Sequence, residues 1–435
     1  MEGKAFMQDG TFQRQTVTFL AAVLLVFGAV STAFSAVPEP QSGGKFFQSK
    51  GTKAAPNYEG RAGGPSYEYG KGLQLWQVHL KPFANYSYKW DNNIFLEENG
   101  RESDFSHNLS TGVTGELPIN GGQHVISGSY LADFEWFQSH TDQDHIDHTV
   151  VLGGDFNFVP FSLNLEDVFR RTVDRSDTEF TTRISREENT AHALLEIPFA
   201  SFFLETEPYD LTVDYRIPAD DIFSHNQFII FQRVGIDVAP STQLLAEYGY
   251  ENIYYWNVND RDGDANQVAV GLRGTFRERI SYQIWGGAQW RIYDVASRPD
   301  FNGFIMRSAV QYEISEASKI VLKADRNPQE STFDDQSFYV RNRIELGWTQ
   351  QIAERLFFNT RENIQYNEYS RITVRDHTER TRRDYVWESA VGLEYFMPND
   401  LISFFGEYKY SARESNTSLL SYDDQTVSAG IRSKF

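Results

Sequence analysis

The sequence predicts an all-β, transmembrane antiparallel β-barrel of about eighteen strands, with sixteen as the alternative, short periplasmic turns and long extracellular loops. Three observations predict it: an N-terminal export signal, a hydrophobic period of two from residue 78 onward, and short turns that alternate with long charged connections. A period of two places successive side chains on opposite faces of a strand. Because one face of a membrane barrel meets lipid and the other meets the lumen, such a chain is polar on average, as the mean hydropathy of -0.49 is.

Composition excludes several classes of function. The 435 residues contain no cysteine, which rules out disulfides, thiolate nucleophiles, cysteine zinc sites and iron–sulfur clusters. The formal net charge of -20 argues against a nucleic-acid partner, which requires a basic surface.

The N-terminus reads as a secretory signal followed by a tail. An apolar run from Val17 to Val30 follows Lys4 and Arg14, and small residues suited to cleavage end it near Ser35. About 14 apolar residues fall short of the roughly 20 that span a bilayer as a helix. We therefore expect a signal peptide in residues 1–35, a flexible periplasmic tail rich in Pro, Gly, Ser and Lys in residues 36–72, and the barrel in residues 73–435.

The alternation begins at residue 78 and runs to the C-terminus. Val78, Leu80, Tyr86, Tyr88 and Trp90 share one face of the first strand, and polar residues occupy the other. Eight short turns are predicted, at residues 118–122, 160, 198–208, 240–242, 277–279, 315–318, 350–354 and 397–400. Eight longer connections alternate with them, at residues 91–103, 141–147, 171–188, 259–264, 294–303, 327–336, 370–383 and 412–424. Eight turns separate nine hairpins, which predicts eighteen strands and both termini in the periplasm.

Large aromatic residues gather at one height of the predicted strands, just before the long connections. Such a ring is typical of the interfacial girdle of a membrane barrel, whereas a soluble all-β sandwich would use the same residues as its core. The predicted girdle consists of Tyr86, Tyr88, Trp90, Phe134, Trp136, Tyr254, Trp256, Trp290 and Trp387.

The C-terminus carries a predicted assembly signal. The terminal Phe435 lies in phase with Ile431, Ala429 and Val427, and outer-membrane barrels resemble one another in ending this way. Outer-membrane lipid, lipopolysaccharide and the barrel assembly machinery are the partners that this location implies.

The segment from Leu80 to Phe95 and the triplet Ser103, Asp104 and Phe105 resemble the opening hairpin of an outer-membrane β-barrel porin family that is associated with exopolysaccharide gene clusters. Trp90 stands where the family more usually has Tyr. The resemblance implies export of an exopolysaccharide across the outer membrane, with an anionic polysaccharide and a periplasmic polysaccharide-export protein as partners. A general or substrate-specific diffusion porin for small solutes is the alternative, and a barrel that only anchors or displays its loops is the third hypothesis.

Charged residues fall at many positions that the alternation turns toward the lumen. Burying them requires water or partners of opposite charge. The inward basic residues either pair with neighbouring carboxylates or form a basic wall for anionic sugars, whose carboxylates match arginine geometry. The predicted wall consists of Arg273, Arg291, Arg307, Lys323, Arg341, Arg343 and Arg361, and five further arginines lie in residues 370–383.

Two acidic loops contain residue types that can bind metal ions. Asp260, Asp262 and Asp264 resemble part of a calcium loop but lack its final Glu, so we interpret them as a turn. A second loop could offer imidazole and carboxylate ligands to zinc, although a solvated polar loop is favoured, and no metal or cofactor is assigned. That loop contains His140, Asp142, Asp144, His145, Asp147 and His148. Most histidines lie in loops, no catalytic residue is assigned, and an enzyme is not expected.

Overall fold

The computed structural model describes residues 73–75, 77–175, 179, 182–217, 220–257, 260–333, 336–375, 378–398, 400–417 and 419–434. Between residues 371 and 380 it describes the backbone but not the side chains. The predicted signal peptide, the predicted tail and the terminal Phe435 lie outside the described residues.

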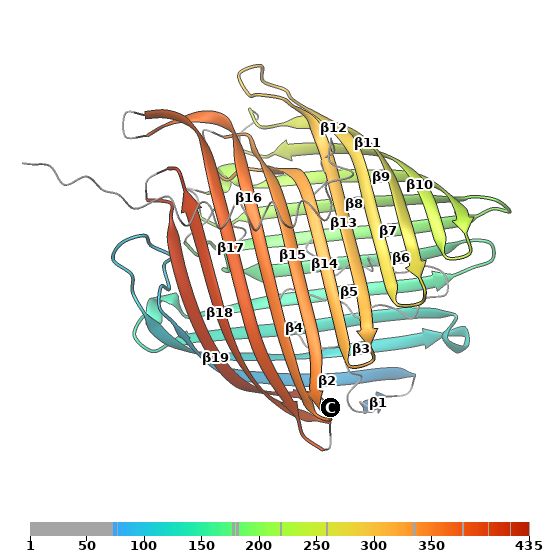
Figure 1. Ribbon diagram of the computed structural model, residues 1–435, viewed down its shortest axis with the longest axis horizontal. Helices are drawn as coiled ribbons and strands as arrows, with labels where there is room; N and C mark the ends of the chain where they lie inside the picture. The colour runs from blue at the N-terminus through green and yellow to red at the C-terminus, as the bar shows by residue number, and fades with distance from the viewer. Residues whose placement is uncertain are drawn as a thin grey trace, which may run out of the picture.

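The described chain is almost entirely β-structure (Figure 1). A short strand, β1, is followed by long strands that contain 11 to 20 residues each. The first nine strands after it are β2 (Val78–Asp91), β3 (Asp104–Ile119), β4 (His124–Phe137), β5 (His145–Asn157), β6 (Ser162–Thr172), β7 (Arg186–Pro198), β8 (Phe203–Tyr215), β9 (His225–Ala239) and β10 (Thr242–Tyr255). The remaining nine are β11 (Gly263–Phe276), β12 (Ile280–Tyr293), β13 (Phe301–Ser315), β14 (Ser318–Glu330), β15 (Phe338–Ala353), β16 (Leu356–Arg375), β17 (Thr378–Phe396), β18 (Ile402–Ser415) and β19 (Tyr422–Lys434).

Strands β2 to β19 form a closed ring of eighteen antiparallel strands, as the sequence predicted. Each strand pairs with its neighbours in the sequence, and β19 pairs with β2, from Lys434 opposite Phe83 to Thr426 opposite Asp91. The extra strand β1 (Leu73–Leu75) pairs with the start of β2. Closure leaves no free sheet edge, which is the condition for a β-structure to span a bilayer. Figure 1 shows the near and far walls crossing at a wide angle, because the strands tilt around the barrel.

The register separates an apolar outward face from a polar inward one. Trp90 lies opposite Phe105 and Val427, and these side chains point outward, whereas Lys89 lies opposite Ser106 and points inward. The predicted aromatic girdle is on the outward face, where Trp136, Trp290 and Trp387 are each about two-fifths exposed. The barrel therefore presents large apolar side chains to its surroundings and has its polar side chains inside.

All eight predicted turns are present, and they lie at one end of the barrel, which we call the turn end. The predicted connections are wrong in three respects. Residues 370–383 are not a loop, because β16 continues to Arg375 and β17 begins at Thr378. The turn predicted at residues 198–208 covers only residues 199–202, and Pro208 lies within β8. A ninth connection, residues 216–224, was not predicted and contains the short helix η3 (Asp221–Phe223).

The opposite end of the barrel, which we call the loop end, has the nine connections that begin after β2, β4, β6, β8, β10, β12, β14, β16 and β18. Two further single-turn helices are η1 (Asn120–Gly122), at the turn end, and η2 (Thr141–Gln143), at the loop end. Among the described residues, no helix is long and apolar enough to cross a membrane.

The predicted assembly signal is described in part. Val427, Ala429 and Ile431 lie on the outward face of β19, opposite Trp90, Tyr88 and Tyr86 of β2, at the seam that closes the ring. This position is consistent with a role in closure, and the role itself stays a prediction.

We expect deletion of Phe435, or its replacement by Asp, to lower the yield of folded barrel in outer-membrane fractions several-fold, because the last strand must be recognised before it closes against the first. Heat-modifiable mobility on gels of membrane fractions measures this yield. The conservative variant Phe435→Tyr is the control, and an equal yield from all three variants would contradict the role.

Candidate functional site

The lumen is lined by charged side chains at the positions that the alternation predicted. All seven members of the predicted basic wall face inward, and so do seven further charged residues, because each lies in register with other inward residues of neighbouring strands. They are Lys81, Lys89, Asp133, Glu135, Arg273, Arg291, Arg307, Lys323, Arg341, Arg343, Arg361, Glu388, Glu394 and Arg432.

The predicted basic wall is paired with carboxylates on β14 and β15. Arg341 and Arg343 both donate to Asp325, with Nε–Oδ distances of 3.0 and 2.6 Å. Lys323 Nζ lies 3.7 Å from a carboxylate oxygen of Glu345. These contacts match the ion-pair alternative for the wall rather than a row of unpaired cations.

The other members of the wall also face carboxylates. Arg273 donates to Glu205 at 2.5 Å, and Arg361 interacts electrostatically with Glu388 and Glu407. Toward the loop end, Arg291 is almost fully buried and forms ion pairs with both Glu251 and Glu330. Arg307 forms an ion pair with Glu247. Six of the seven members of the wall therefore form cross-strand ion pairs, which fix the positions of their cationic groups.

A further arginine, Arg233, is the centre of the largest of these clusters and was not singled out from the sequence. Its guanidinium donates to Glu247 at 2.6 Å, pairs with Glu207 and lies 3.5 Å from Glu205. Glu205 is 1% exposed and Arg233 is 9% exposed. His192 also contacts Glu207, at 3.0 Å. The single inward arginine of β9 thus holds three carboxylates from β8 and β10, of which Glu205 and Glu247 are buried.

Aromatic rings separate the guanidinium groups of this cluster. Arg233 and Arg307 each lie within 5.5 Å of the ring centres of Phe231 and Trp285, in cation–π geometry. The ring of Trp285 lies directly over Gly271, where an added Cβ would come within 2.4 Å of it. Glycine is required there because the ring approaches the backbone closely.

The connection between β6 and β7 crosses the lumen at the loop end. Glu179 is 3% exposed and accepts hydrogen bonds from Ser331 Oγ at 2.8 Å and from the Thr332 amide at 2.6 Å. Its own backbone carbonyl accepts a bond from Arg413 of β18 at 3.1 Å. Because β14 lies eight strands from β6 around the ring, these contacts join nearly opposite sides of the barrel.

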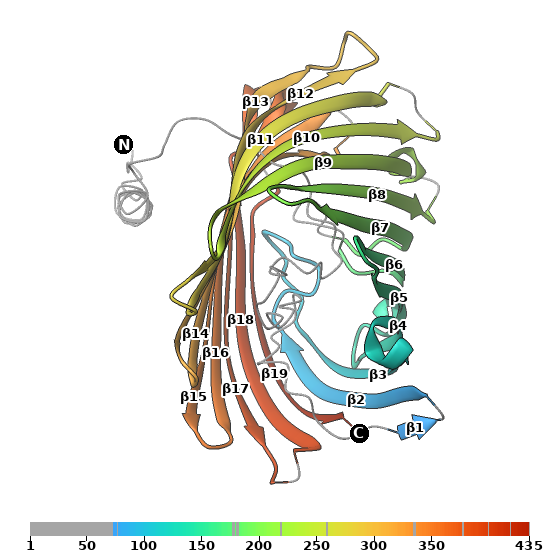
Figure 2. The ribbon, with the colours of Figure 1, turned by 90° about the vertical axis from the view of Figure 1, so that its right-hand side faces the viewer.

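The same connection is held on its near side by two arginines. Arg175 donates to the carbonyl of Ile94, in the connection between β2 and β3, at 2.6 Å. Arg183 donates to Glu135 at 3.1 Å and lies over the ring of Phe137. Figure 2 shows the blue β2–β3 connection within the outline of the barrel. We call residues 173–185 the crossing connection, and we infer that it narrows the lumen.

The connection between β14 and β15, residues 331–337, is the anchor for the far end of the crossing connection. Arg261, 2% exposed, donates to the backbone carbonyls of Ser331, Phe333 and Gln336 at 2.6 to 2.7 Å. Arg382 of β17 lies 4.1 Å from the centre of the Phe333 ring. We call residues 331–337 the anchor loop, and its position depends on the cationic side chains of Arg261 and Arg382.

The His and Asp residues of the histidine-rich loop do not share one site, because they contact different partners. His140 contacts Asp104 and Glu102, at 2.9 and 2.7 Å, and His148 points outward to Tyr130. Asp144 accepts a bond from the Phe137 amide, and Gln143 lies against Asp142. Only His145 and Asp147, on β5, turn toward the lumen.

The contacts of His140 predict a pH dependence. Hydrogen bonds to Asp104 and then to Glu102 raise the pKa of His140 above its usual range. A raised folded-state pKa means that this contact contributes fully below the unfolded pKa of about 6.5 and is lost as pH rises through the folded value. We expect the protection factors of residues 138–144, in which the intrinsic pH dependence of amide exchange cancels, to fall above that pH. His140→Asn should remove this fall, and an unchanged pH profile of the protection factors in the variant would contradict the assignment.

The second acidic loop forms no common site. Asp260 pairs with Arg298, Asp262 accepts the Tyr255 amide, and Asp264 points outward to the Tyr250 hydroxyl. Asp260 and Asp262 precede β11, Asp264 lies within it, and the three carboxylates contact separate partners.

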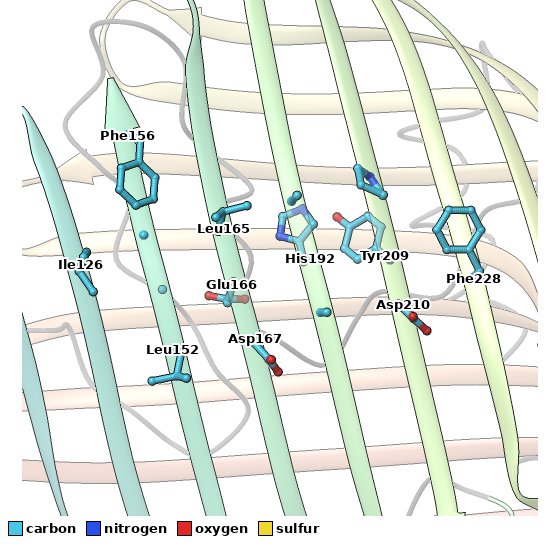
Figure 3. Close-up of a pocket in the computed structure, with 15 residues that line it drawn as sticks. Ile126, Leu152, Phe156, Leu165, Glu166, Asp167, His192, Tyr209, Asp210 and Phe228 are labelled. Carbon is cyan, nitrogen blue, oxygen red and sulfur yellow. The ribbon is translucent and has the colours of Figure 1, made fainter. Parts of the chain in front are cut away.

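A hollow of about 550 Å³ lies in the wall formed by β4 to β9 (Figure 3). Its lining includes the outward residues Leu152, Leu165 and Phe228, at a place where no pairing joins β7 to β8 between His192 and Leu195. Pro208 lies there and lacks the N–H that a sheet ladder needs. The hollow is largely apolar and on the outward face, so it is a feature of the membrane-facing surface and not of the lumen.

Comparison with known proteins supports a barrel channel. Residues 220–435 match the family model described as "Putative beta-barrel porin 2", which confirms the resemblance to a porin family over about half of the chain. No curated protein sequence matches the chain. These findings and the closed barrel identify an outer-membrane β-barrel of the porin type, so the loop end is extracellular.

Three similar solved structures illustrate the likeness. Acinetobacter baumannii OccAB3 is 10% identical, covers 83% of this chain and 100% of its own, and has a TM-score of 0.45. A BenF-like porin from Pseudomonas fluorescens Pf-5 is 8% identical over 83% and 100%, with a TM-score of 0.46. Pseudomonas aeruginosa OccK2 (OpdF), in complex with glucuronate, is 8% identical over 83% and 99%, with a TM-score of 0.47.

The expectation that this chain exports an exopolysaccharide is wrong. The family model that matches describes a porin and makes no reference to an exopolysaccharide. The geometry gives a physical reason, because the crossing connection bridges the extracellular end of the lumen between Glu179 and the anchor loop.

Proposed function

We propose that this protein is a diffusion porin for small solutes, and that it transports without catalysing a reaction. The observation that carries the proposal is the combination of a charged lumen with a crossing connection at its extracellular end. An eighteen-stranded barrel is wide enough to hold an aqueous channel, and charged walls keep the channel wet. Because the crossing connection is hydrogen-bonded across the extracellular end of the lumen, it limits the size of the solutes that enter.

His192, one of the histidines that face the lumen, does not contradict a passive channel. His192 contacts Glu207, and Glu207 in turn accepts the Tyr209 hydroxyl and pairs with Arg233. Each group of this cluster is engaged in holding the wall together. A general acid or base would need a free position facing substrate.

Liposome swelling tests the proposal. Full-length protein reconstituted into liposomes should admit a pentose fastest, a disaccharide more slowly and a tetrasaccharide slowest, with no entry of a dextran polymer. Liposomes without protein are the control. Equal rates for the pentose and the dextran, or no swelling with any solute, would overturn the proposal.

The basic wall should set ion selectivity within this channel. Replacing Arg341, Arg343 and Arg361 together with Gln leaves the carboxylates they face, including Asp325, uncompensated. We expect the ratio of cation to anion permeability to rise on the order of 2-fold at about 0.1 M salt and less at higher salt, because screening weakens each charge. Reversal potentials in planar bilayers measure this ratio.

The matched control is Arg326→Gln, because Arg326 lies between these strands but points outward, toward Asn342 and the ring of Phe304. It should leave the permeability ratio unchanged. An unchanged ratio in the triple variant, with the barrel folded, would show that the wall acts only as structure.

A further inference from the structure

Three side chains that bind metals in many proteins meet at the extracellular rim of β5. His145 and Asp147 project inward from β5, and Asp174 belongs to the crossing connection that follows β6. One ligand atom from each lies within 4.8 Å of the other two. Ligand atoms bound at about 2.1 Å to one tetrahedral ion lie about 3.4 Å apart, so the groups need to close by at most about 1.4 Å.

The surrounding charge favours a cation. Asp133 and Glu135 lie directly opposite Asp147 and His145 across the β4–β5 ladder. Four carboxylates therefore crowd this rim, since Asp174 faces Asp147. Glu135 is paired with Lys89 at 2.5 Å and with Arg183 at 3.1 Å. Asp147 is only 7% exposed, and two facing carboxylates in such a place repel each other unless a cation or proton lies between them.

Two of the three groups are held in orientation by other bonds. The Nδ1 of His145 lies 2.9 Å from the Gln143 carbonyl, which favours the tautomer that leaves the Nε2 lone pair available. Asp147 accepts bonds from Thr172 Oγ1 at 2.6 Å and from the Val173 amide at 3.0 Å. Partners of this kind orient the ligands in metal sites.

We propose that His145, Asp147 and Asp174 bind one divalent transition-metal cation and thereby fix the crossing connection to β5. One imidazole and two carboxylates are a donor set that suits Zn²⁺ better than Ca²⁺, which takes oxygen ligands. Water would complete the coordination. Arg183 competes with the ion, because its Nη1 lies 3.1 Å from the imidazole Nε2.

The consequence for transport rests on the proposed function. Asp174 lies near the start of the crossing connection, and Glu179, farther along it, contacts the anchor loop. An ion on Asp174 would restrain the connection at its near end, so the bound channel should conduct less and fluctuate less than the metal-free channel.

Binding is tested first, with full-length protein in detergent micelles that has been stripped with a chelator and titrated with Zn²⁺. We expect one equivalent to bind by calorimetry, and Co²⁺ to give the visible absorption of a protein-bound ion. His145→Ala and Asp174→Asn should each weaken binding by about 10-fold or more. His148→Ala is the matched control, because His148 lies on the same strand and points outward, and its affinity should stay at that of the wild type.

Arg183→Gln separates a real site from weak binding to surface carboxylates, because removal of the competing cation should tighten binding. Absence of binding to the wild type, or equal affinity in the His145→Ala and His148→Ala variants, would overturn the site. Circular dichroism and heat-modifiable mobility verify that each variant folds.

Conductance then tests the restraint. Addition of Zn²⁺ should lower single-channel conductance in the wild type and not in Asp174→Asn. Binding without any change in conductance would overturn the restraint but leave the metal site. A wild type that binds Zn²⁺ but admits no solute would instead overturn the porin proposal.

Discussion

Replacing Arg233 with Gln should lower the free energy of unfolding of the barrel by about 3–5 kcal/mol, the cost of removing one partner from a buried ion pair. Arg233 compensates Glu207 and Glu247 by direct contact and lies 3.5 Å from Glu205. Without Arg233, the carboxylates of the cluster are left with two guanidinium groups, those of Arg273 and Arg307, in place of three. Denaturant titration in detergent, followed by tryptophan fluorescence, measures the loss.

The control is Arg216→Gln, because Arg216 is half exposed and pairs with Glu187 at the outer rim. Exposed pairs contribute little to stability because water and salt screen them, so this variant should unfold close to the wild type. The double variant Arg233→Gln, Glu207→Gln should recover part of the loss, since Glu207 loses its guanidinium partner with Arg233, whereas Glu247 keeps Arg307. Equal unfolding midpoints for Arg233→Gln and Arg216→Gln would show that the cluster does not stabilise the wall.

Much of the fold could be predicted because a period of two is a strict constraint. Once Val78, Tyr86 and Trp90 are assigned to one face, the face of each remaining residue of the strand is determined. The turn residues then give the number of hairpins. The same reasoning placed Arg273 and Arg361 in the lumen. A shift of one residue would have turned each of them toward lipid.

The alternation fails where a strand leaves the membrane. In residues 370–383 Thr and Arg recur without an alternation of apolar and polar residues, so a hairpin cannot be distinguished from a loop by pattern alone. Pro208 misled the prediction for a different reason, because proline within a strand is tolerated only where a ladder bond is missing, and that place is known only from the register.

The contacts of the candidate site could not be predicted, since they join residues far apart in the sequence. Arg291 on β12 forms an ion pair with Glu251 on β10, two strands earlier, and Glu179 accepts a hydrogen bond from Thr332 across the lumen. No periodicity carries such information. Arg233 illustrates the limit, because its inward position follows from the alternation but its three partners follow only from strand order and stagger.

Replacing Arg261 with Ala should raise single-channel conductance and its fluctuation as much as any other single change at the extracellular end. The guanidinium donates to three carbonyls of the anchor loop and lies between the rings of Phe223 and Tyr255. Hydrogen bonds to a charged group each contribute about 1.5–3 kcal/mol, so their loss should release the loop. Because Ser331 and Thr332 hold Glu179, the crossing connection should lose its far anchor with it.

Planar-bilayer recordings and hydrogen exchange of residues 331–337 measure this release. Arg261→Lys should be intermediate, because an ammonium retains the charge but cannot reach three carbonyls in one plane. Glu179→Ala should produce the same increase in conductance from the other side of the contact. If both variants act by freeing the crossing connection, the double variant should exceed neither single one by much, since the second change removes an anchor that is already lost. Additive increases would mean that Arg261 and Glu179 control separate parts of the mouth.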